Sequence, residues 1–403
     1  MTEQSAVEGG SQASEESNEV DRRVTELLAE ADPRTTDLET FLGKQFDAGL
    51  AFVDYPVGKG GLALPAGLQR RIDDQLDAAG AHRAFLLNPV GVGMLPPTLL
   101  RHGTEEQQRR FLRPAFAGQE IWCQLFSEPG AGSDLAGLST RAVRDGADWV
   151  INGQKIWTSL AHKATWGILL ARTDPELPKH QGITYFIVNM RQPGIRVRPL
   201  KQLNGQSDFN EVLLDDVKVP DTDRIGGVGE GWAAARTTLS SERAALSGAG
   251  TGAANIGGSA VERLVELAIT NGRWRDPVAR SRIVDLVIES TLIRATNQRR
   301  RAALRSGRSV GAEGAVTKIG AGLHNRRLQE AFLDIAAATA LAWDDQTPRG
   351  GRIASGYLRA QANTIEGGTS NVLRDVIAER VLGMPRDPAE LPRSTPWKDI
   401  PRR

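Results

Sequence analysis

The chain has 403 residues, of which 40% are hydrophobic and 25% charged, a balance typical of a globular protein with two or three domains. Fifty basic and 49 acidic residues give a net charge of +1, which excludes a strong electrostatic surface for nucleic acid or acidic membranes. Cys123 is the only cysteine, which excludes an intrachain disulfide and a cysteine-based metal cluster, and we expect no metal site.

The N-terminal stretch, residues 1–20, is rich in Ser, Glu and Gly, which predicts a disordered tail. It is acidic and lacks the basic and apolar regions of a secretory signal. The sequence also contains no run of 18 apolar residues that would predict a membrane span. We therefore expect a cytoplasmic protein.

Three further regions follow in chain order, and together they predict an α+β fold. Residues 21–120 carry apolar side chains at i, i+3 and i+4, which predicts an N-terminal all-α domain. Residues 121–227 have short β-branched or aromatic runs between turn sequences, which predicts a middle antiparallel β-barrel domain. Residues 228–385 return to helical spacing with short connections, as in a C-terminal four-helix bundle. Residues 386–403 are rich in Pro and Arg and predict a second tail.

The first informative motif, QLFSEPGAGSD, runs from Gln124 to Asp134. Pro129, Gly130 and Gly132 favour an irregular loop, in which closely spaced backbone N–H groups and small hydroxyls can hold a polar, planar ligand. A surface turn has the same composition, because Gly-rich loops are common. The motif alone leaves both interpretations open.

The second motif, NGQKIWTS, occupies residues 152–159 and begins with the Asn-Gly signal of a β-hairpin. Trp157 is followed by Thr158 and Ser159, so an aromatic face lies beside two hydroxyls. A flavin isoalloxazine ring requires such groups, because it stacks on aromatic rings and accepts a hydrogen bond at N5. Alternatively, Trp157 is a core residue.

Together, these two motifs at this spacing resemble the acyl-CoA dehydrogenase family. The resemblance covers about Asp37 to Pro385 and includes YPVGKGGL, HGTEEQQRRFL, FNEVLLDDVKVP, GEGW and IEGGTSNVLRDVIAERVLGMPR. It implies the fold deduced above, usually as a tetramer. It also implies that the protein uses FAD to oxidise the Cα–Cβ bond of an acyl-CoA and passes the electrons to an electron-transfer flavoprotein.

The resemblance also implies which residues form the site. The implied cofactor contacts are Gln124, Phe126, Ser127, Ser133, Trp157, Thr158, Ser159, Thr369 and Asn371. The implied substrate contacts are Ser133, Ser240 and Arg243.

The reaction requires a carboxylate that removes a weakly acidic proton from C2 of the thioester. Many family members carry it in the last loop, at the position where this chain has Gly367 rather than Glu366. A smaller branch, including isovaleryl- and long-chain-type enzymes, carries the base in a Glu-Arg pair on the helix that starts the bundle, which matches Glu242 and Arg243. We predict Glu242 as the base, with Glu366 as the alternative. The backbone N–H of Gly367 is the implied donor to the thioester carbonyl.

Two regions depart from the family pattern. Residues 271–277 match poorly the segment that reaches the FAD pyrophosphate, and residues 334–348 lack a glycine run that lets backbone approach phosphates. These departures resemble the bacterial branch that oxidises CoA thioesters of sterol side chains, whose members often form α2β2 heterotetramers. Two alternatives follow. One is a partly or non-catalytic subunit of a heteromeric enzyme, and the other is an oxygen-using relative such as an acyl-CoA oxidase or flavin monooxygenase.

Overall fold

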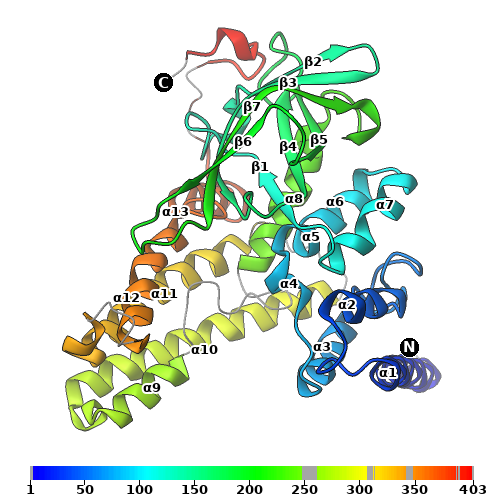
Figure 1. The fold of residues 1–403 in the computed structure, drawn as a ribbon. Coiled ribbons are helices and arrows are strands. Elements are labelled where there is room, and N and C mark those ends of the chain that lie inside the picture. The colour runs from blue at the N-terminus through cyan, green and yellow to red at the C-terminus, as the bar shows by residue number, and fades with distance from the viewer. Residues whose placement is uncertain are drawn as a thin grey trace. The chain divides into compact units, whose positions relative to one another are not determined.

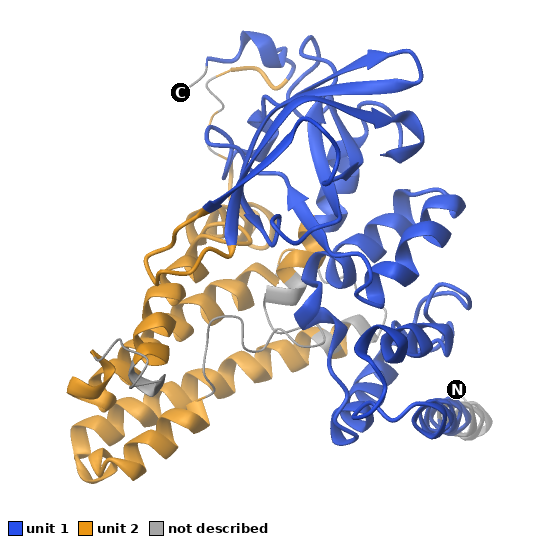
Figure 2. Ribbon diagram, viewed as in Figure 1, with its two compact units in different colours: residues 1–199, 209–238, 394–403 blue, residues 200–208, 239–393 orange. Residues whose placement is uncertain are grey.

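The computed structural model describes residues 3–246, 261–305, 312, 314–341, 348–386, 388 and 391–401. The chain divides into two compact units, drawn in different colours in Figure 2. Unit 1 comprises residues 1–199, 209–238 and 394–403, and unit 2 comprises residues 200–208 and 239–393.

The N-terminal part of unit 1 is helical, as its apolar spacing predicts. Its helices are α1 (Glu3–Glu30), α2 (Leu38–Asp47), α3 (Gln69–Ala78), α4 (Ala84–Leu87), α5 (Pro89–Gly93), α6 (Leu95–His102) and α7 (Glu105–Phe116), with a 3-10 helix, η1, at Ala66–Leu68. Helix α1 includes most of the residues whose composition predicts a tail. Its buried side chains Val20, Val24 and Leu27 recur every three or four residues, so they lie on one face of the helix.

Helix α7 has a capping box at its N-terminus. Phe111, near the middle of the helix, packs against the sheet. The hydroxyl of Thr104 accepts a hydrogen bond from the Gln107 amide at 3.2 Å, and the Gln107 side chain accepts one from the Thr104 amide at 3.0 Å. The ring of Phe111 lies edge-on against Trp122 and Trp166, with centroid distances of 5.3 and 5.2 Å. These contacts position the helix against the two strands that carry Trp122 and Trp166.

The middle of unit 1 is a sheet of eight strands, in the order β6-β7-β3-β2-β4-β5-β8, with β1 paired to β4 (Figure 1). The strands are β1 (Trp122–Leu125), β2 (Arg141–Asp145), β3 (Asp148–Ser159), β4 (Trp166–Arg172), β5 (Ile183–Asn189), β6 (Ile195–Leu200), β7 (Phe209–Pro220) and β8 (Arg224–Ile225). A short 3-10 helix, η3 (Asp221–Asp223), separates β7 from β8.

The predicted antiparallel barrel requires a correction. The strand order does not close within the part of the chain that the structure describes, and β1 and β2 pair with β4 in parallel. The parallel pairing follows from the long connection between β1 and β2, which includes the 3-10 helix η2 (Leu135–Gly137) and lets the chain enter the sheet twice in the same direction. The remaining pairs are antiparallel.

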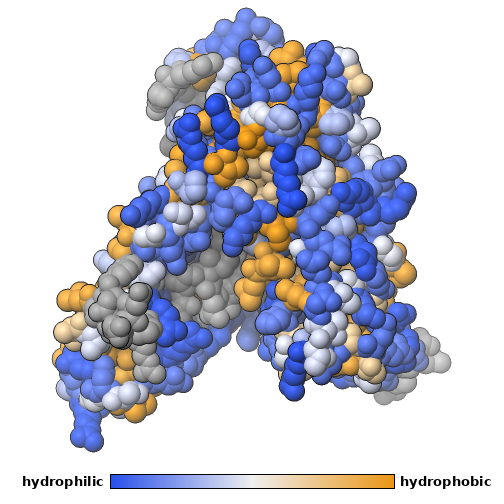
Figure 3. Space-filling model, viewed as in Figure 1, coloured by the Kyte–Doolittle hydropathy of each residue, from blue (hydrophilic) through white to orange (hydrophobic). Residues whose placement is uncertain are grey.

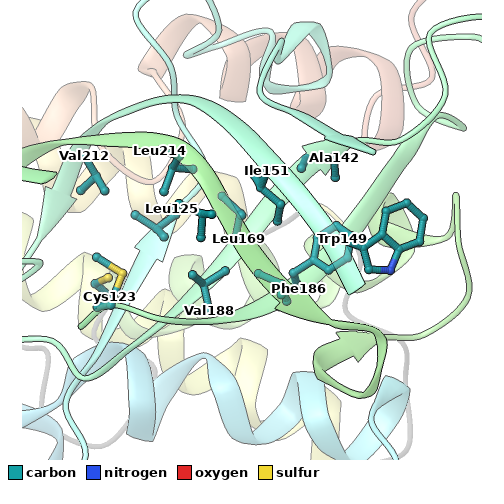
Figure 4. Close-up of a cluster of buried hydrophobic side chains, with 14 of the residues drawn as sticks. Cys123, Leu125, Ala142, Trp149, Ile151, Leu169, Phe186, Val188, Val212 and Leu214 are labelled. Carbon is teal, nitrogen blue, oxygen red and sulfur yellow. The ribbon is translucent and has the colours of Figure 1, made fainter. Parts of the chain in front are cut away.

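A buried apolar cluster holds the strands of the sheet together (Figure 4). Trp149 and Ile151 of β3 contribute to it from alternate positions, as expected for one face of a strand. Leu125, Leu169 and Phe186 contribute from β1, β4 and β5. The two predicted motifs include the C-terminal ends of β1 and β3, and both strands therefore pack in this apolar core.

Unit 2 is the predicted helical C-terminal region. It contains the end of α8 (Gly231–Leu246), then α9 (Val261–Thr270), α10 (Pro277–Arg305), α11 (Gly314–Ala336), α12 (Pro348–Ala360) and α13 (Ser370–Arg380), with 3-10 helices η4 (Arg273–Arg275), η5 (Ala337–Ala340) and η6 (Gln361–Thr364). Helix α11 contacts α9, α10, α12 and α13. Leu264, Ile283 and Phe332 pack together in a core made by α9, α10 and α11.

Helix α10 has apolar side chains on two faces. Ala279, Ile283 and Leu286 are buried, whereas an exposed stripe recurs at i, i+3, i+4 and i+8. This α10 stripe consists of Val284, Val287, Ile288 and Leu292.

Polar side chains cover most of the face of the molecule shown in Figure 3, with apolar groups exposed between them. Among the described residues, we find no helix both long and apolar enough to span a membrane.

The segment predicted as a C-terminal tail returns to unit 1. Residues 394–401 include a 3-10 helix, η7 (Trp397–Asp399), and the backbone of Trp397 donates a hydrogen bond to Leu177 O at 3.0 Å.

Candidate active site

The first predicted motif forms a loop between β1 and β2, residues 126–140, which we call the flavin loop. Two of its carbonyls are held by β3: Ile156 N donates to Ser127 O at 2.9 Å, and Lys155 Nζ donates to Phe126 O at 3.0 Å. Reciprocal backbone hydrogen bonds between Glu128 and Ala131 close a tight turn at its tip. The loop is therefore an ordered part of the fold.

A buried ion pair lies beneath this loop. Lys155 is fully buried, and its Nζ lies 2.8 Å from Glu128 Oε1. The Glu128 carboxylate also accepts hydrogen bonds from the amides of Ser139 and Thr140, at 2.7 and 2.9 Å. Burial by itself would raise the pKa of Glu128, but Lys155 and these hydrogen bonds lower it to about 2. Glu128 therefore remains ionised at neutral pH. Its carboxylate, near the start of the flavin loop, binds Ser139 and Thr140 at the end of the loop.

The second motif contains a β-bulge. Lys155 opposes Val212 and Thr158 opposes Asn210, so β3 has one more residue than β7 in this interval. The extra residue allows Trp157 to adopt φ 62°, a left-handed conformation that is uncommon for a bulky side chain. Trp157 is 60% exposed and has a ring contact with Phe209. The structure therefore presents Trp157 at the surface of unit 1 and excludes the alternative of a core residue.

Thr158, the next residue, is buried with its hydroxyl unused. Its Oγ1 has no hydrogen-bond partner among the described residues, whereas its carbonyl accepts a hydrogen bond from Asn210 Nδ2 at 2.9 Å. A buried hydroxyl without a partner is costly, so such a group commonly marks a place where a ligand or water completes the bonding. Ser159 follows and is half-buried.

The other cofactor residues predicted in unit 1 differ in exposure. Gln124 and Ser127 are half-buried, Phe126 is buried and Ser133 is exposed at the far side of the flavin loop. The ring of Phe126 packs edge-on against Tyr185 at 5.7 Å. All these residues belong to unit 1.

Unit 2 contains both candidate bases. The carboxylate of Glu366 accepts hydrogen bonds from Arg359, at 2.9 and 3.3 Å, and from Asn363 at 2.6 Å. Glu242 is half-buried, and its charge acts on Arg243 and Lys318. Glu366 is thus fixed by a bidentate ion pair, an arrangement typical of a structural carboxylate.

Lys318, on α11, connects the last loop with both candidate bases. Its Nζ donates to Gly368 O at 2.7 Å, and the side chain is 4% exposed. Desolvation lowers the pKa of Lys318, and the charges of Glu366 and Glu242 oppose this effect. Desolvation also lowers the pKa of Arg243, with Glu242 opposing it and Arg380 adding to it. A buried cation therefore lies near both candidate bases.

The last loop ends in a helix cap. Gly367 and Gly368 have φ of 64° and 96°, which few residues other than glycine adopt, so the chain turns sharply here. Thr369 is the N-cap of α13, and its hydroxyl accepts a hydrogen bond from Val372 N at 3.2 Å. Asn371 is exposed and accepts a hydrogen bond from Arg374. Ser240, predicted as a substrate contact, is exposed on α8.

Two features of the candidate site were not predicted from the sequence, the Glu128–Lys155 pair and the contact of Lys318 with the last loop. Lys155 occupies the same face of β3 as Trp149 and Ile151, since strand side chains alternate with period two. A lysine on an otherwise apolar face requires a carboxylate partner, so this pattern could have predicted an ion pair. Lys318 has no comparable local signal, because its partners lie far away in the sequence.

Comparison with protein families matches residues 123–217 to the acyl-CoA dehydrogenase middle domain and residues 229–382 to the acyl-CoA dehydrogenase C-terminal domain. The acyl-CoA dehydrogenase IpdE1 of Mycobacterium tuberculosis is 38% identical over 343 residues, which cover 84% of this chain and 86% of IpdE1. The chain belongs to the acyl-CoA dehydrogenase family. This membership confirms the family predicted from the motifs.

Other acyl-CoA dehydrogenases give the same result. FadE34 of M. tuberculosis is 42% identical over 340 residues, and the chain covers 45% of that relative's length. The Tcur3481–Tcur3483 steroid ACAD has a TM-score of 0.75 and 28% identity over 93% of this chain and 98% of that chain. The ChsE4–ChsE5 complex from M. tuberculosis has a TM-score of 0.70 and 26% identity, with the same coverage. The acyl-CoA dehydrogenase fold with a middle sheet and a helical C-terminal region is confirmed, and so is the resemblance to the sterol branch.

Proposed function

We propose that this protein oxidises the Cα–Cβ bond of an acyl-CoA thioester. The observation that carries the proposal is the bulge in β3. In a member of this family, the motif assigns to the flavin an exposed Trp in a strained conformation and a buried Thr. The hydroxyl of this Thr has no hydrogen-bond partner in the part of the chain that the structure describes. Strained backbone and unsatisfied polar groups concentrate at functional sites.

We propose FAD as the cofactor. When bound, FAD supplies the oxidant that accepts a hydride from C3 of the substrate. Trp157 offers a ring for stacking, and Thr158 offers a hydroxyl whose hydrogen bond is not already made within the described chain. Gln124, Phe126, Ser127, Ser133 and Ser159 in unit 1, and Thr369 and Asn371 in unit 2, are the other residues that would hold it. Within unit 1, an exposed aromatic ring beside hydroxyl groups suits a planar ligand with polar edges.

We propose that Glu242 removes the proton from C2. Glu366, the alternative, is held by Arg359 and Asn363, so its use as a base would break a bidentate ion pair. The Gly367 backbone N–H would donate to the thioester carbonyl, and the hydrogen bond between Lys318 and Gly368 O fixes the same loop two peptide groups further on. Ser133, Ser240 and Arg243 would contact the substrate.

We propose a CoA thioester of a sterol side chain as the substrate and an electron-transfer flavoprotein as the electron acceptor. The similar steroid ACAD structures support the substrate class. We further propose a homotetramer or an α2β2 heterotetramer with a paralogous subunit. The ChsE4–ChsE5 complex offers a heteromeric precedent, and the α10 stripe supplies an apolar surface for a subunit contact.

One observation favours a second candidate, a partly catalytic subunit that needs its paralogue. Where many family members have a glycine run, the described residues 334–341 form the end of α11 and then η5, with alanines in place of glycines. The rest of this region, residues 342–347, lies outside the described residues. Side chains there limit how closely backbone can approach phosphates.

Purification of the protein alone and with its paralogue, followed by flavin quantitation and anaerobic addition of acyl-CoAs, separates these candidates. The screen includes sterol side-chain and short branched thioesters. Bleaching of the flavin by a thioester supports the dehydrogenase. Flavin that appears only in the co-purified complex supports the partly catalytic subunit. Peroxide formed in air at the rate of substrate use would identify an oxygen-using enzyme, and a protein without flavin under both conditions contradicts the proposal.

A further inference from the structure

The flavin loop is held by more than the Glu128–Lys155 pair. Beyond Asp134, its backbone forms the 3-10 helix η2, and three consecutive carbonyls of this stretch point to side-chain donors. Arg172 donates through Nη2 to Ala136 O at 2.7 Å and through Nε to Leu138 O at 3.1 Å. The carbonyl between them, Gly137 O, accepts a hydrogen bond from Trp397 Nε1 at 3.3 Å. Trp397 lies 260 residues further along the chain.

Trp397 belongs to the segment of residues 394–401, which we call the C-terminal strap. The strap is fixed to unit 1 by its backbone: Trp397 N donates to Leu177 O at 3.0 Å, and Lys398 N donates to Pro175 O at 3.1 Å. An ion pair of 2.9 Å between Lys398 and Glu176 lies at its exposed side. The strap lies beside the sheet near the C-terminus (Figure 1).

Trp397 also completes the environment of Arg172. The guanidinium carbon of Arg172 lies 4.4 Å from the centroid of the Trp397 ring, which is the geometry of a cation–π contact. Arg172 is only 3% exposed, and desolvation lowers its pKa to about 10, with Glu128 and Asp134 opposing this effect. The ring of Trp397 replaces water next to a buried cation and thereby stabilises the residue that holds the loop.

We propose that the C-terminal strap positions the flavin loop, with Trp397 as a positioning residue that acts through Arg172 and Gly137 O. This inference rests on the proposed function for its ligand. Trp397 contacts η2 and Arg172, and η2 lies later in the flavin loop than the predicted cofactor residues Phe126 and Ser127. Trp397, which lies outside the two matched family regions, therefore supports the flavin loop from the strap.

The test compares three variants of the full-length protein in two assays. The substitutions are Trp397→Ala, Trp397→Phe and, as a matched control on the same strap, Lys398→Ala. One assay is hydrogen exchange of residues 133–139 in the flavin-free protein, where the amides of Gly137 and Leu138 are hydrogen-bonded within η2. The other is the dissociation constant of FAD, measured by titrating the flavin-free protein. The first assay needs no cofactor.

We expect Trp397→Ala to raise both the exchange rate and the dissociation constant of FAD by roughly tenfold, since it removes a hydrogen bond and a cation–π contact. Trp397→Phe retains the ring over Arg172 but not the N–H donor, so an increase of about threefold is expected. Lys398→Ala should leave both quantities unchanged.

Unchanged exchange in Trp397→Ala overturns the proposal, and so does faster exchange with unaltered FAD binding. If Trp397→Ala does not fold, Trp397→Phe decides by the same two criteria. A wild-type protein that binds no FAD contradicts the proposed function. The exchange assay then still decides whether the strap holds the loop.

Discussion

The hydroxyl of Thr158 is buried and has no hydrogen-bond partner among the described residues. The flavin-free protein bears the cost of this hydroxyl, whereas a bound ligand would use it. The same substitution should therefore affect the two states in opposite directions. This makes Thr158 a direct probe of the cofactor assignment.

We predict that Thr158→Val stabilises the flavin-free protein, by up to about 1–3 kcal/mol, because it removes an unsatisfied polar group. FAD affinity should fall at the same time, since the proposed hydrogen bond to the flavin is lost. Thermal unfolding of the flavin-free protein and FAD titration measure the two effects. Thr158→Ser, which retains the hydroxyl, is the control. Equal FAD affinity in Thr158→Val and wild type would contradict the contact.

A second prediction at this scale concerns the pH dependence of the Glu128–Lys155 pair. The pKa of Glu128 falls from an ordinary 4.5 to about 2 in the folded chain. Its stabilising effect is therefore complete above about pH 4.5 and is lost as the pH falls towards 2.

Glu128→Gln should lower the free energy of unfolding by roughly 3 kcal/mol at neutral pH, because Lys155 stays buried without its carboxylate. The difference in free energy of unfolding between wild type and variant should shrink as the pH falls from about 5 to 2, because wild-type Glu128 becomes progressively protonated. Urea unfolding across this pH range measures it. A difference that stays constant would show that the pair is not ionised in the folded protein.

The candidate site could be predicted only in part from the sequence. The two motifs identify the loop and the bulge because their residues are contiguous. The Glu128–Lys155 pair joins residues 27 positions apart, and Trp397 reaches Gly137 over 260 positions. Such contacts depend on the tertiary fold, which local patterns do not encode.

At the scale of elements, the last loop connects α12 and α13 and is fixed from α11. Lys318 on α11 holds Gly368 O, and its positive charge acts on Glu242. Thr369 caps α13 one residue later. Lys318 therefore holds the loop that bears the proposed thioester donor. It also places a positive charge near the proposed base, Glu242.

We predict that Lys318→Met slows flavin reduction by an acyl-CoA by roughly tenfold and moves the acidic limb of its pH profile to higher pH by up to about one unit. The direction follows because a nearby cation favours the ionised form of a carboxylate, so its removal makes the base easier to protonate. Stopped-flow reduction at a series of pH values gives both quantities. Lys318→Arg, which retains the charge, should keep the wild-type limb. A limb that moves to lower pH, or not at all, would exclude this role.

The sheet gives the clearest difference between prediction and structure. Alternating short strands correctly predict a sheet, but pairing direction depends on the connections. The 15 residues of the flavin loop, 126–140, carry the chain from β1 to β2 so that both enter parallel to β4. The sequence of this loop predicts only an irregular connection. The residue types therefore could not predict that β1 and β2 would lie parallel to β4.

At the scale of the molecule, the α10 stripe is an apolar surface that the described chain leaves exposed. Exposed apolar patches on soluble proteins commonly mark association surfaces. Periodicity alone could not have separated the stripe from the buried face, because both consist of aliphatic residues at helical spacing. The structure distinguishes them through the packing of Ile283 and Leu286 in the core.

We predict that Leu292→Glu reduces the assembly to a smaller oligomer, because a charge placed in an apolar contact lacks a partner. Mass photometry at fixed protein concentration measures the change, alone and with the paralogous subunit. Thr25→Glu adds the same charge at an exposed position of α1, which is not part of the stripe, and should leave the assembly unaltered. An unchanged mass for Leu292→Glu would remove α10 from the proposed subunit contact.

If Glu242 is the base of an α,β-dehydrogenation, replacing it should slow anaerobic single-turnover flavin reduction. Glu242→Gln and Glu366→Gln are compared with wild type, using the thioester that reduces the wild-type flavin fastest. The account predicts that Glu242→Gln keeps its FAD but reduces it about 10²–10⁴-fold more slowly, whereas Glu366→Gln stays within about tenfold of wild type. A Glu242→Gln protein that reduces its flavin at a near-normal rate would contradict the account and return the assignment of the base to Glu366.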